Sequence, residues 1–552
     1  MTLTIGSCGR KKDDGSKNNG VLLERMERLE KALIETLVEQ KDIPSPPYTN
    51  QSSGTGPLLQ ISPSCPSSGR IHFAGFNLGF ISSFGGIPFF SKEGQDWVRS
   101  RTGESIALDG LLQHIPTWHK QREILYQSPP CGQDLPPRAV LQQYVEVYWS
   151  SFIRRVFPFV DTVMFNKTID LVYQNSGHAS SRACVFAFLA FMSNFRWHDM
   201  SLPEIDGNAY EVEAERLFQV LAREPVTLDG LQTVMMLATF HMYTANLGCV
   251  DLFLACAARM IFALGGNIPS TSGNCHIRTL FWLCYVLDKD LSLRTGRPPS
   301  LADEQCDLTL PPEYVQNIAS LGLNTSPGDL LDQFPGDLRL SIIKSKTYNG
   351  LYSARSMSKP DAELLRTIRE LDDELDRWRS LFPVPCRLGF LTDRSTGVHA
   401  SMRGAMLTLE YYHCTTMIHQ ASSRCNAWAA ANGHELEGVS SSLALCVEAS
   451  RSSLLHLKAS RAIIPDDCFW VVIFYPVSGF LTLFCNILMN PSHERAPDDL
   501  KLIEAYSMCL GEIPARRLSI DEIFHFKLIN DFLRELSRLA KCAVDQAADR
   551  SH

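Results

Sequence analysis

From about Val140 onward, apolar residues recur at the 3.6-residue spacing of an α-helix almost throughout the chain. Tyr210, Ala214 and Leu221 lie on one such stripe, and similar stripes follow it towards the C-terminus. This part contains no sustained alternation of polar and apolar residues, the pattern that indicates a half-buried β-strand. The spacing therefore predicts an all-α fold, with one large multi-helix domain over residues 140–545.

The charge of the chain limits how it can meet nucleic acid. Its 552 residues include 60 acidic and 52 basic side chains, which give a formal net charge of -8. Nonspecific affinity for DNA comes from clustered Lys and Arg, so any DNA contact must be local. The 17 cysteines are scattered, many of them inside helical patterns, as is usual for reduced intracellular proteins. The first twenty residues lack the apolar segment of a secretory signal peptide, which disfavours secretion.

Residues 1–20 are predicted to form a basic, disordered tail that contains Arg10, Lys11 and Lys12. A basic tail ahead of a dimerising helix is where contacts with the DNA backbone would lie, and the same side chains are candidates for a weak nuclear import signal. A solvated tail without a binding role accounts for them equally well. The sequence favours neither interpretation.

Residues 21–41 have the spacing of a short coiled coil. Four apolar residues follow one another at alternating steps of four and three, which places them on one seam: Leu22, Met26, Leu29 and Leu33. We expect a parallel dimer through this seam. The alternative is a single amphipathic surface helix, because about three heptads is short for a coiled coil.

Three further segments differ from the helical pattern. Residues 42–70 carry many Pro, Ser and Gly residues and few large apolar ones, so they predict a linker. Residues 71–139 begin with an aromatic, Gly-rich stretch without helical period, which predicts an irregular arm packed on the main domain. Residues 311–360 are polar and contain Gly and Pro, and they predict a long surface insertion.

Residues 469–489 are apolar enough to be mistaken for a membrane span. Pro476 and Gly479 interrupt the stretch, and Asp466 and Asp467 precede it without the basic flank that orients a span. A helix that is apolar all round is more often buried in a protein core. We therefore expect a core helix and no contact with a membrane.

Residues with catalytic or metal-binding potential are sparse. The sequence contains no C-x2-C pair and no H-E-x-x-H. His413, Cys414 and His419 come closest to a zinc-binding group, but positions 413 and 419 fall on different faces of a helix. Ser341 and Lys344 fit S-x-x-K without its companion motifs. No catalytic, cofactor-binding or metal-binding residue is therefore predicted, and the chain is not expected to be an enzyme.

Asp288 and Asp290 are two residues apart on an apparent helix, so their side chains point in different directions. This arrangement does not suit a paired-carboxylate site. Asp288 is instead expected to pair with Arg294 or Arg297 inside the fold.

Residues 278–311 read RTLFWLCYVLDKDLSLRTGRPPSLADEQCDLTLP. They combine a Leu-Phe-Trp helix, a Tyr-x-x-Asp step, a Gly-Arg-Pro turn, an acidic pair and a Leu-Pro close. The residues of this pattern are Leu280, Phe281, Trp282, Tyr285, Asp288, Gly296, Arg297, Pro298, Asp303 and Asp307. The segment closely resembles the most recognisable part of the fungal-specific transcription factor domain, the middle region of binuclear zinc-cluster regulators. Lys289 stands where that family has Arg, which keeps the charge but loses the planar fork.

The resemblance extends over roughly residues 140–540 and implies an all-helical regulatory domain. In this family a module of six cysteines holds two zinc ions and reads DNA, ahead of a linker and a coiled coil. Only Cys8 precedes the coiled coil here, so this sequence lacks that module and no cofactor is expected in it. The motif residues, Trp282 and Asp288 among them, are expected to have structural roles.

The resemblance implies a nuclear regulator of RNA polymerase II transcription, with a specialised-metabolism pathway as the guess from family habit. The implied partners are DNA, if a zinc module lies upstream or in a partner, a homodimer or heterodimer partner, the transcription machinery and a small-molecule inducer. The alternative is a regulatory or cofactor protein that lacks DNA binding and works by pairing with partners or by binding a small inducer. The aromatic residues between 186 and 197 are candidates for an inducer pocket, although core packing is the more typical role of such stripes.

Overall fold

The computed structural model describes residues 69–81, 88–107, 134–196, 198–199, 201–221, 223–269, 275–312, 314–315, 334–381, 402–426, 437–464, 468–510 and 520–551. All of them belong to the unit Ser62–His552. The predicted sites in the tail and the coiled coil lie outside the described residues and remain predictions: Arg10, Lys11, Lys12, Leu22, Met26, Leu29 and Leu33.

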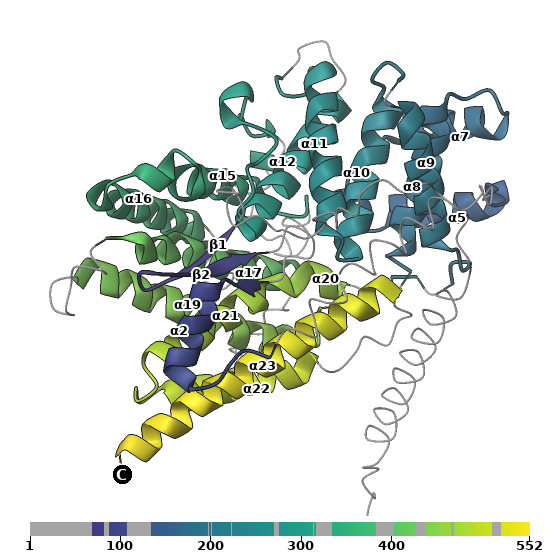
Figure 1. The fold of residues 1–552 in the computed structure, drawn as a ribbon. Coiled ribbons are helices and arrows are strands. Elements are labelled where there is room, and N and C mark those ends of the chain that lie inside the picture. The colour runs from purple at the N-terminus through teal and green to yellow at the C-terminus, as the bar shows by residue number, and fades with distance from the viewer. Residues whose placement is uncertain are drawn as a thin grey trace, which may run out of the picture. The chain divides into compact units, whose positions relative to one another are not determined.

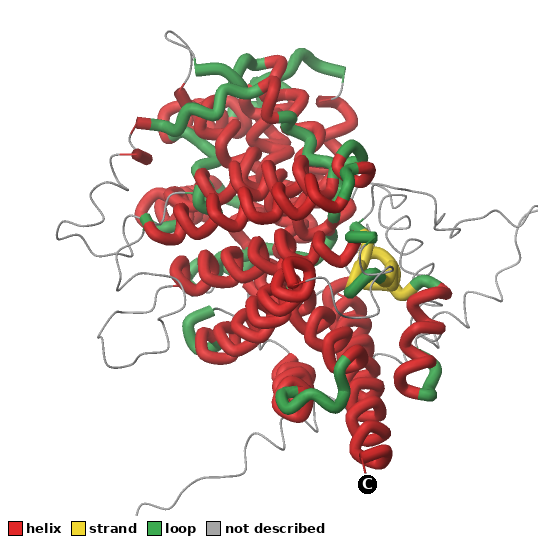
Figure 2. Tube along the Cα trace, turned by 90° about the vertical axis from the view of Figure 1, so that its left-hand side faces the viewer, coloured by secondary structure: helices red, strands yellow, loops and turns green. Residues whose placement is uncertain are grey.

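Helices make up most of the described structure, which confirms the predicted all-α fold (Figure 1; Figure 2). The helices before residue 300 are α2 (Lys92–Thr102), α5 (Arg138–Ser150), α6 (Ile153–Val156), α7 (Thr162–Tyr173), α8 (Ala179–Ser193), α9 (Gly207–Leu221), α10 (Leu228–Tyr243), α11 (Leu247–Ala263) and α12 (Cys275–Thr295). Those after it are α15 (Leu338–Thr347), α16 (Asp361–Ser380), α17 (Met402–Gln420), α19 (Glu437–Ser460), α20 (Phe469–Val472), α21 (Phe474–Met489), α22 (Ala496–Leu510) and α23 (Ile520–Ser551). Short 3-10 turns and one π-helical turn, Tyr348–Tyr352, connect some of them.

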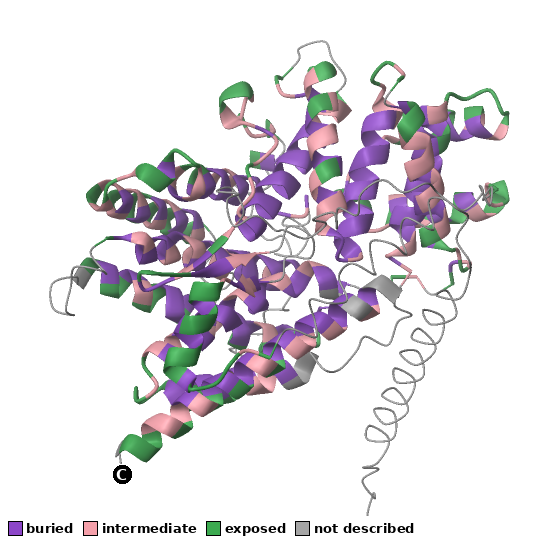
Figure 3. Ribbon diagram, in the orientation of Figure 1, coloured by how far each residue is buried: buried purple, intermediate pink, exposed green. Residues whose placement is uncertain are grey.

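Two helices that are apolar on nearly every side lie at the centre of the part before residue 300 (Figure 3). In α8 every residue from Ser180 to Met192 except Arg182 is buried, and α10 is buried from Gly230 to Tyr243. A helix with no polar face is typical of a protein core. The helix α12 lies against α11 and α15 and is likewise buried from Leu280 to its end.

The segment before the helical domain is a small sheet, where an irregular arm was predicted. Strands β1 (Arg70–Phe73), β2 (Phe76–Ile81) and β3 (Pro88–Phe90) form an antiparallel sheet in the order β1-β2-β3. Phe73 faces Phe76 across a two-residue turn, Ala74 and Gly75, whose φ values are 46° and 85°. Positive φ at both turn residues matches the right-handed twist of a hairpin, but Ala-Gly is a weaker sequence signal than Asn-Gly, so the hairpin was missed.

The helix α2 follows the sheet and joins it to the main domain. The Ser91 side chain accepts a hydrogen bond from the Gly94 N–H at the helix start, and Gly103 ends the helix in the left-handed conformation. Trp97 and Val98 are buried in one apolar cluster with side chains of α21 and α23. The described residues of this segment up to Thr102 therefore pack on the main domain as strands and a helix.

The apolar stretch predicted as a core helix forms α20 and α21, and most residues of α21 are buried. Phe480, Leu483 and Phe484 are fully buried in the cluster that also holds the sheet. The prediction of a core helix is confirmed. Among the described residues, no helix is long and apolar enough to cross a membrane.

The helix α15 corrects the predicted surface insertion at residues 311–360. Leu338, Leu340 and Ile343 are buried, and so is Lys344, which is 1% exposed. The helix lies between α12, α16 and α17. Its sequence appears polar because buried charged side chains, paired inside the domain, interrupt the apolar residues.

Candidate functional site

The turn after α12 is fixed by the carboxylate of Asp288. Its two oxygens accept hydrogen bonds from the backbone N–H groups of Ser300 and Leu301, at 2.7 and 3.1 Å. Burial raises the pKa of Asp288, while the neighbouring Lys289 charge and the two N–H groups oppose that rise. The carboxylate thus holds residues 296–301 back against the helix that precedes them.

Lys289 lies next to Asp288 in α12 and contacts the same turn. Its ammonium donates a hydrogen bond to the Leu301 carbonyl and lies 3.4 Å from both Asp288 Oδ2 and Asp303 Oδ1. The Tyr285 hydroxyl also donates to Asp303 Oδ1, at 3.0 Å. The other oxygen of Asp303 accepts from the Ser345 hydroxyl at 2.7 Å, which ties the turn to α15. A compact ammonium can serve three oxygens arranged in this way without a planar fork.

The predicted pairing of Asp288 with Arg294 or Arg297 is wrong. Arg294 lies 2.7 Å from Asp290 Oδ2, four residues earlier on the same helix face, and Arg297 lies 2.5 Å from Asp251 Oδ2 on α11. Side chains four apart on a helix are neighbours, whereas positions 288 and 294 point apart.

The remaining motif residues have structural surroundings. Trp282 is fully buried, and the Arg278 guanidinium lies over its ring and that of Phe281. Gly296 has a φ of 70° and its N–H donates to the Ser292 carbonyl, which ends α12. Pro298 lies exposed in the turn.

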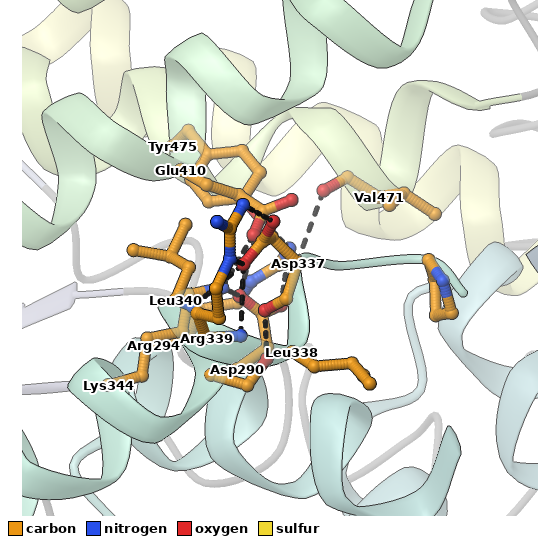
Figure 4. A network of polar contacts seen from close by, with 12 residues as sticks. Asp290, Arg294, Asp337, Leu338, Arg339, Leu340, Lys344, Glu410, Val471 and Tyr475 are labelled. Atoms are coloured by element: carbon orange, nitrogen blue, oxygen red, sulfur yellow. Dashed lines mark hydrogen bonds and ion pairs between the residues drawn. The ribbon is translucent and has the colours of Figure 1, made fainter. Parts of the chain in front are cut away.

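A second group of charged residues, here called the ionic network, lies inside the domain (Figure 4). Its members come from α12, α15, α17 and α21 and comprise Asp290, Arg294, Lys344, Glu410 and Tyr475. The Lys344 ammonium donates to Asp290 Oδ1 at 2.6 Å and to Glu410 Oε2 at 2.8 Å. Arg294 donates to the Tyr475 hydroxyl, which donates in turn to Asp290 Oδ1 at 3.3 Å. Two cations and two carboxylates therefore balance in a buried volume.

The charges of the ionic network hold one another ionised. Burial raises the pKa of Asp290, but Arg294 and Lys344 outweigh this effect and lower it to about 2. Burial lowers the pKa of Lys344, but Asp290 and Glu410 outweigh this effect and raise it well above its usual value. Lys344 therefore lacks the neutral amine that a general base or nucleophile needs, which argues against the S-x-x-K pattern as a catalytic one.

A cavity of about 40 Å³ adjoins the ionic network. Arg294 and His413 line it together with residues of the sheet and α21. Neither ring nitrogen of His413 has a hydrogen-bond partner among the described residues, and the ring packs edge-on against Phe474 and Tyr475. Burial lowers the pKa of His413 to about 3, with the Asp290 carboxylate opposing. The cavity has room for about three water molecules.

The three residues considered for zinc have separate surroundings. His413 faces aromatic rings, and Cys414 is buried in an apolar cluster with side chains of α16. His419 lies 2.9 Å from the Ser442 hydroxyl and 3.2 Å from an oxygen of Asp372. The fold does not bring these three side chains together as a ligand set.

Sequence reasoning missed the ionic network, although a signal was present. Asp290 and Arg294 lie four apart in a helix that is mostly apolar, and Glu410 interrupts the apolar stretch LTLEYY. A charged residue inside an apolar stripe is almost never buried without a partner. Such residues could have been predicted as one another's partners, but the pairing across α12, α15 and α17 depends on tertiary structure.

The sheet contacts the end of α12 through two glycines. The Gly69 N–H donates to the Thr295 carbonyl at 2.9 Å, and a Cβ on Gly296 would lie 2.2 Å from the Gly69 Cα. We expect Gly296→Ala to lower the free energy of unfolding by about 1–3 kcal/mol from left-handed strain, and further from this clash. Urea denaturation measures the loss.

Gly265→Ala is the matched control for Gly296→Ala. Gly265 has a nearly identical φ of 72°, but a Cβ there would meet nothing within 4 Å. The free energy of unfolding should fall further in Gly296→Ala than in Gly265→Ala, and the difference measures the contact between the sheet and α12. Equal losses in the two variants would contradict that contact.

One part of the chain matches a known protein family. Residues 145–380 match the model of the fungal specific transcription factor domain, so the predicted resemblance is confirmed for this stretch. It contains the turn after α12 and three members of the ionic network, while Glu410 and Tyr475 lie beyond it.

The curated relatives are named as transcription factors. The chain is 27% identical over 507 residues to an ABC-transporter-regulating transcription factor of Aspergillus oryzae, and equally to one of Aspergillus fumigatus. These alignments cover 86% of this chain and 55% of each relative, so the chain spans about half the length of those proteins. The fusaridione A cluster transcription factor of Fusarium heterosporum is 26% identical over 50% of this chain and 52% of its own length. No solved structure matches the chain. These findings are consistent with a transcription regulator of the fungal zinc-cluster type.

Proposed function

We propose that the protein regulates RNA polymerase II transcription in the nucleus and that its helical unit is the regulatory part. The observation that carries this proposal is the family match over residues 145–380, supported by relatives named as transcription factors along 86% of the chain. The proposal includes dimerisation through residues 21–41 and a contact of the basic tail with DNA phosphates.

DNA recognition is the part of the proposal that needs a further component. The sequence has no six-cysteine module, and its charge of -8 does not suit extended contact with phosphates. We therefore propose that a zinc module upstream of this sequence, or in a dimer partner, reads the DNA. The second candidate, a regulator that acts only by pairing with related proteins, differs in having no such module in the gene.

The names of the relatives supply candidate target genes, which can be tested. Two relatives are named for regulating an ABC transporter, and a third for a fusaridione A cluster. Genes for ABC transporters are therefore the first targets that we propose, and a specialised-metabolism cluster is the second.

Among the described residues, the two cavities at Arg294 are too small for an inducer larger than a few water molecules unless their walls move apart. The cavity beside Arg294 and His413 has a volume of about 40 Å³, and the other cavity at Arg294 has about 30 Å³. Both lie between α21 and neighbouring elements. We propose that an inducer, if one acts here, separates α21 from the sheet, because both cavities border these elements.

A tethering assay tests the regulatory function without knowledge of the natural promoter. The full chain is fused to a bacterial DNA-binding domain, and transcription of a reporter with the matching operator is measured in a fungal host. We expect the fusion to raise or lower reporter transcription relative to the DNA-binding domain alone. Deletion of the gene should also change transcript levels of a limited gene set that includes an ABC transporter. An unchanged reporter together with an unchanged transcriptome would contradict the proposal.

A further inference from the structure

Three helices bring together four side chains with metal-binding atoms, at a place that no sequence pattern indicated. Glu211 and Glu215 come from α9, His241 from α10 and Cys249 from α11. The His241 Nε2 atom lies 2.7 Å from Glu215 Oε1 and 3.3 Å from Glu211 Oε1. The ligand atoms of Glu215, His241 and Cys249 all lie within 4.8 Å of one another.

Local structure fixes the orientation of these side chains. Glu211 and Glu215 are four residues apart, so both point from the same face of α9. The His241 ring stacks on Phe253 with an interplanar angle of 5°, and its Nδ1 has no hydrogen-bond partner in the part of the chain that the structure describes. Stacking therefore sets the plane of the imidazole and directs Nε2 towards the two carboxylates.

The turn between α10 and α11 positions the thiol. Ala245 has a φ of 62°, which reverses the chain within a few residues. The Asn246 side chain accepts from the Cys249 N–H at 3.4 Å, and its amide nitrogen lies 3.2 Å from the Cys249 Sγ. His241 and Cys249 thus face each other from adjacent helices. Glu211 is 5% exposed and His241 is 1% exposed, whereas Glu215 and Cys249 are partly exposed, so the group lies at the edge of the interior.

The donor set selects a class of metal. An imidazole nitrogen, a thiol sulfur and carboxylate oxygens are the ligands that Zn²⁺ takes in tetrahedral sites, whereas Mg²⁺ and Ca²⁺ prefer oxygen ligands alone. Zinc-ligand bonds of about 2.0–2.3 Å place tetrahedral ligands roughly 3.3–3.8 Å apart. The separations among Glu215, His241 and Cys249 need to change by about 1 Å or less to reach this range, and Glu211 Oε1 already lies 3.3 Å from His241 Nε2.

We infer that Glu211, Glu215, His241 and Cys249 bind one Zn²⁺ ion. This site is separate from the six-cysteine module of the family and lies within the regulatory unit. Binding would release the thiol proton of Cys249 and link α9, α10 and α11 through one ion. Zinc would then stabilise this part of the domain, by an amount that grows with the logarithm of the free metal concentration once that concentration exceeds the Kd.

The test uses the full chain, purified and dialysed against a chelator, and titrates it with Co²⁺ and then with Zn²⁺. Other cysteines can bind metal weakly, so the comparison is between matched variants. Cys249→Ser removes the proposed ligand, and Cys256→Ser removes a cysteine of the same helix that lies outside the group. Circular dichroism checks that each variant is folded.

We expect the wild type and Cys256→Ser to bind one Co²⁺ with the visible bands of a tetrahedral thiolate site, and Zn²⁺ to displace it. Cys249→Ser should lose these bands and bind Zn²⁺ at least about tenfold more weakly. Zinc should raise the melting temperature of the wild type and not of Cys249→Ser.

A wild type that binds no more metal than Cys249→Ser would overturn the inference and leave a His241–Glu215 hydrogen bond as the role of the group. If Cys249→Ser does not fold, Glu215→Gln decides the question, because it keeps the shape of the side chain and removes a ligand charge. Unchanged zinc affinity in Glu215→Gln would likewise overturn the inference.

Discussion

Lys344→Met is expected to lower the free energy of unfolding by about 3–5 kcal/mol, because it removes the cation that faces two buried carboxylates. Asp290 keeps Arg294 as a partner, but the side chain of Glu410, which is 4% exposed, loses its ion pair. An unpaired buried carboxylate must either remain desolvated or take up a proton. Urea denaturation followed by tryptophan fluorescence measures the loss.

Two further variants separate this effect from a general cost of substitution. Lys346→Met, two residues along α15, removes an ion pair with Glu374 whose side chains are 49% and 30% exposed. An exposed pair contributes little, so this control should lose less than about 1 kcal/mol. The double variant Lys344→Met with Glu410→Leu removes both charges and should recover most of the stability. Glu410→Leu alone completes the comparison, and a double variant whose loss equals the sum of the losses in Lys344→Met and Glu410→Leu would contradict coupling within the ionic network.

The sequence predicted the elements whose pattern is local. The stripes of α8 and α10 carry enough apolar residues to be recognised as core helices, and α21 could be separated from a membrane span by its interruptions. The turn after α12 was predicted from the resemblance, through Gly296, Arg297 and Pro298, and Gly296 has the left-handed φ that ends the helix.

The elements that sequence reasoning missed depend on contacts between distant segments. The helix α15 appeared polar because Lys344 interrupts it, and only Glu410, 66 residues away, explains why that charge is buried. Asp288 was assigned a partner by helix spacing, whereas its actual partners are backbone groups of a returning turn. The hairpin at β1 and β2 was missed because its turn uses Ala74.

The group around His241 could not be predicted from the sequence for the same reason. Its ligand atoms come from three helices, and the spacing from Glu211 to Cys249 matches no metal-binding pattern in the sequence. Its members are charged or polar residues at interior positions, as in the ionic network. A search for such residues would have named the side chains but not their grouping.

His413→Phe is expected to reduce the loss of stability that the wild type suffers on acidification. Burial lowers the pKa of His413 to about 3, compared with about 6.5 in an unfolded chain. Between these values the unfolded state binds a proton that the native state does not, so this residue lowers stability as the pH falls from about 6.5 towards 3. A shift of this size corresponds to at most about 5 kcal/mol near pH 3.

The groups that face His413 set the direction of this effect. Desolvation has the largest effect on the pKa of His413 and lowers it. The Asp290 carboxylate favours the protonated imidazole, and the Arg294 and Lys344 cations disfavour it. Phenylalanine keeps the edge-on packing against Phe474 and Tyr475 and carries no charge. It also removes two buried ring nitrogens that lack partners among the residues with described structure, so stability at pH 7 should be equal or higher.

Unfolding midpoints in urea at pH 7, 6, 5 and 4 measure the effect. The stability of His413→Phe relative to the wild type should grow as the pH falls, by at most about 1.4 kcal/mol for each pH unit. His72, His276 and His456 also have pKa values lowered mainly by burial, so some acid sensitivity remains in the variant. His178→Gln, at an exposed position, serves as the control and should follow the wild type. Parallel pH profiles for His413→Phe and the wild type would show that His413 takes up its proton at the same pH in the native and unfolded states. That result would place a solvating or anionic group beside it in the cavity at Arg294.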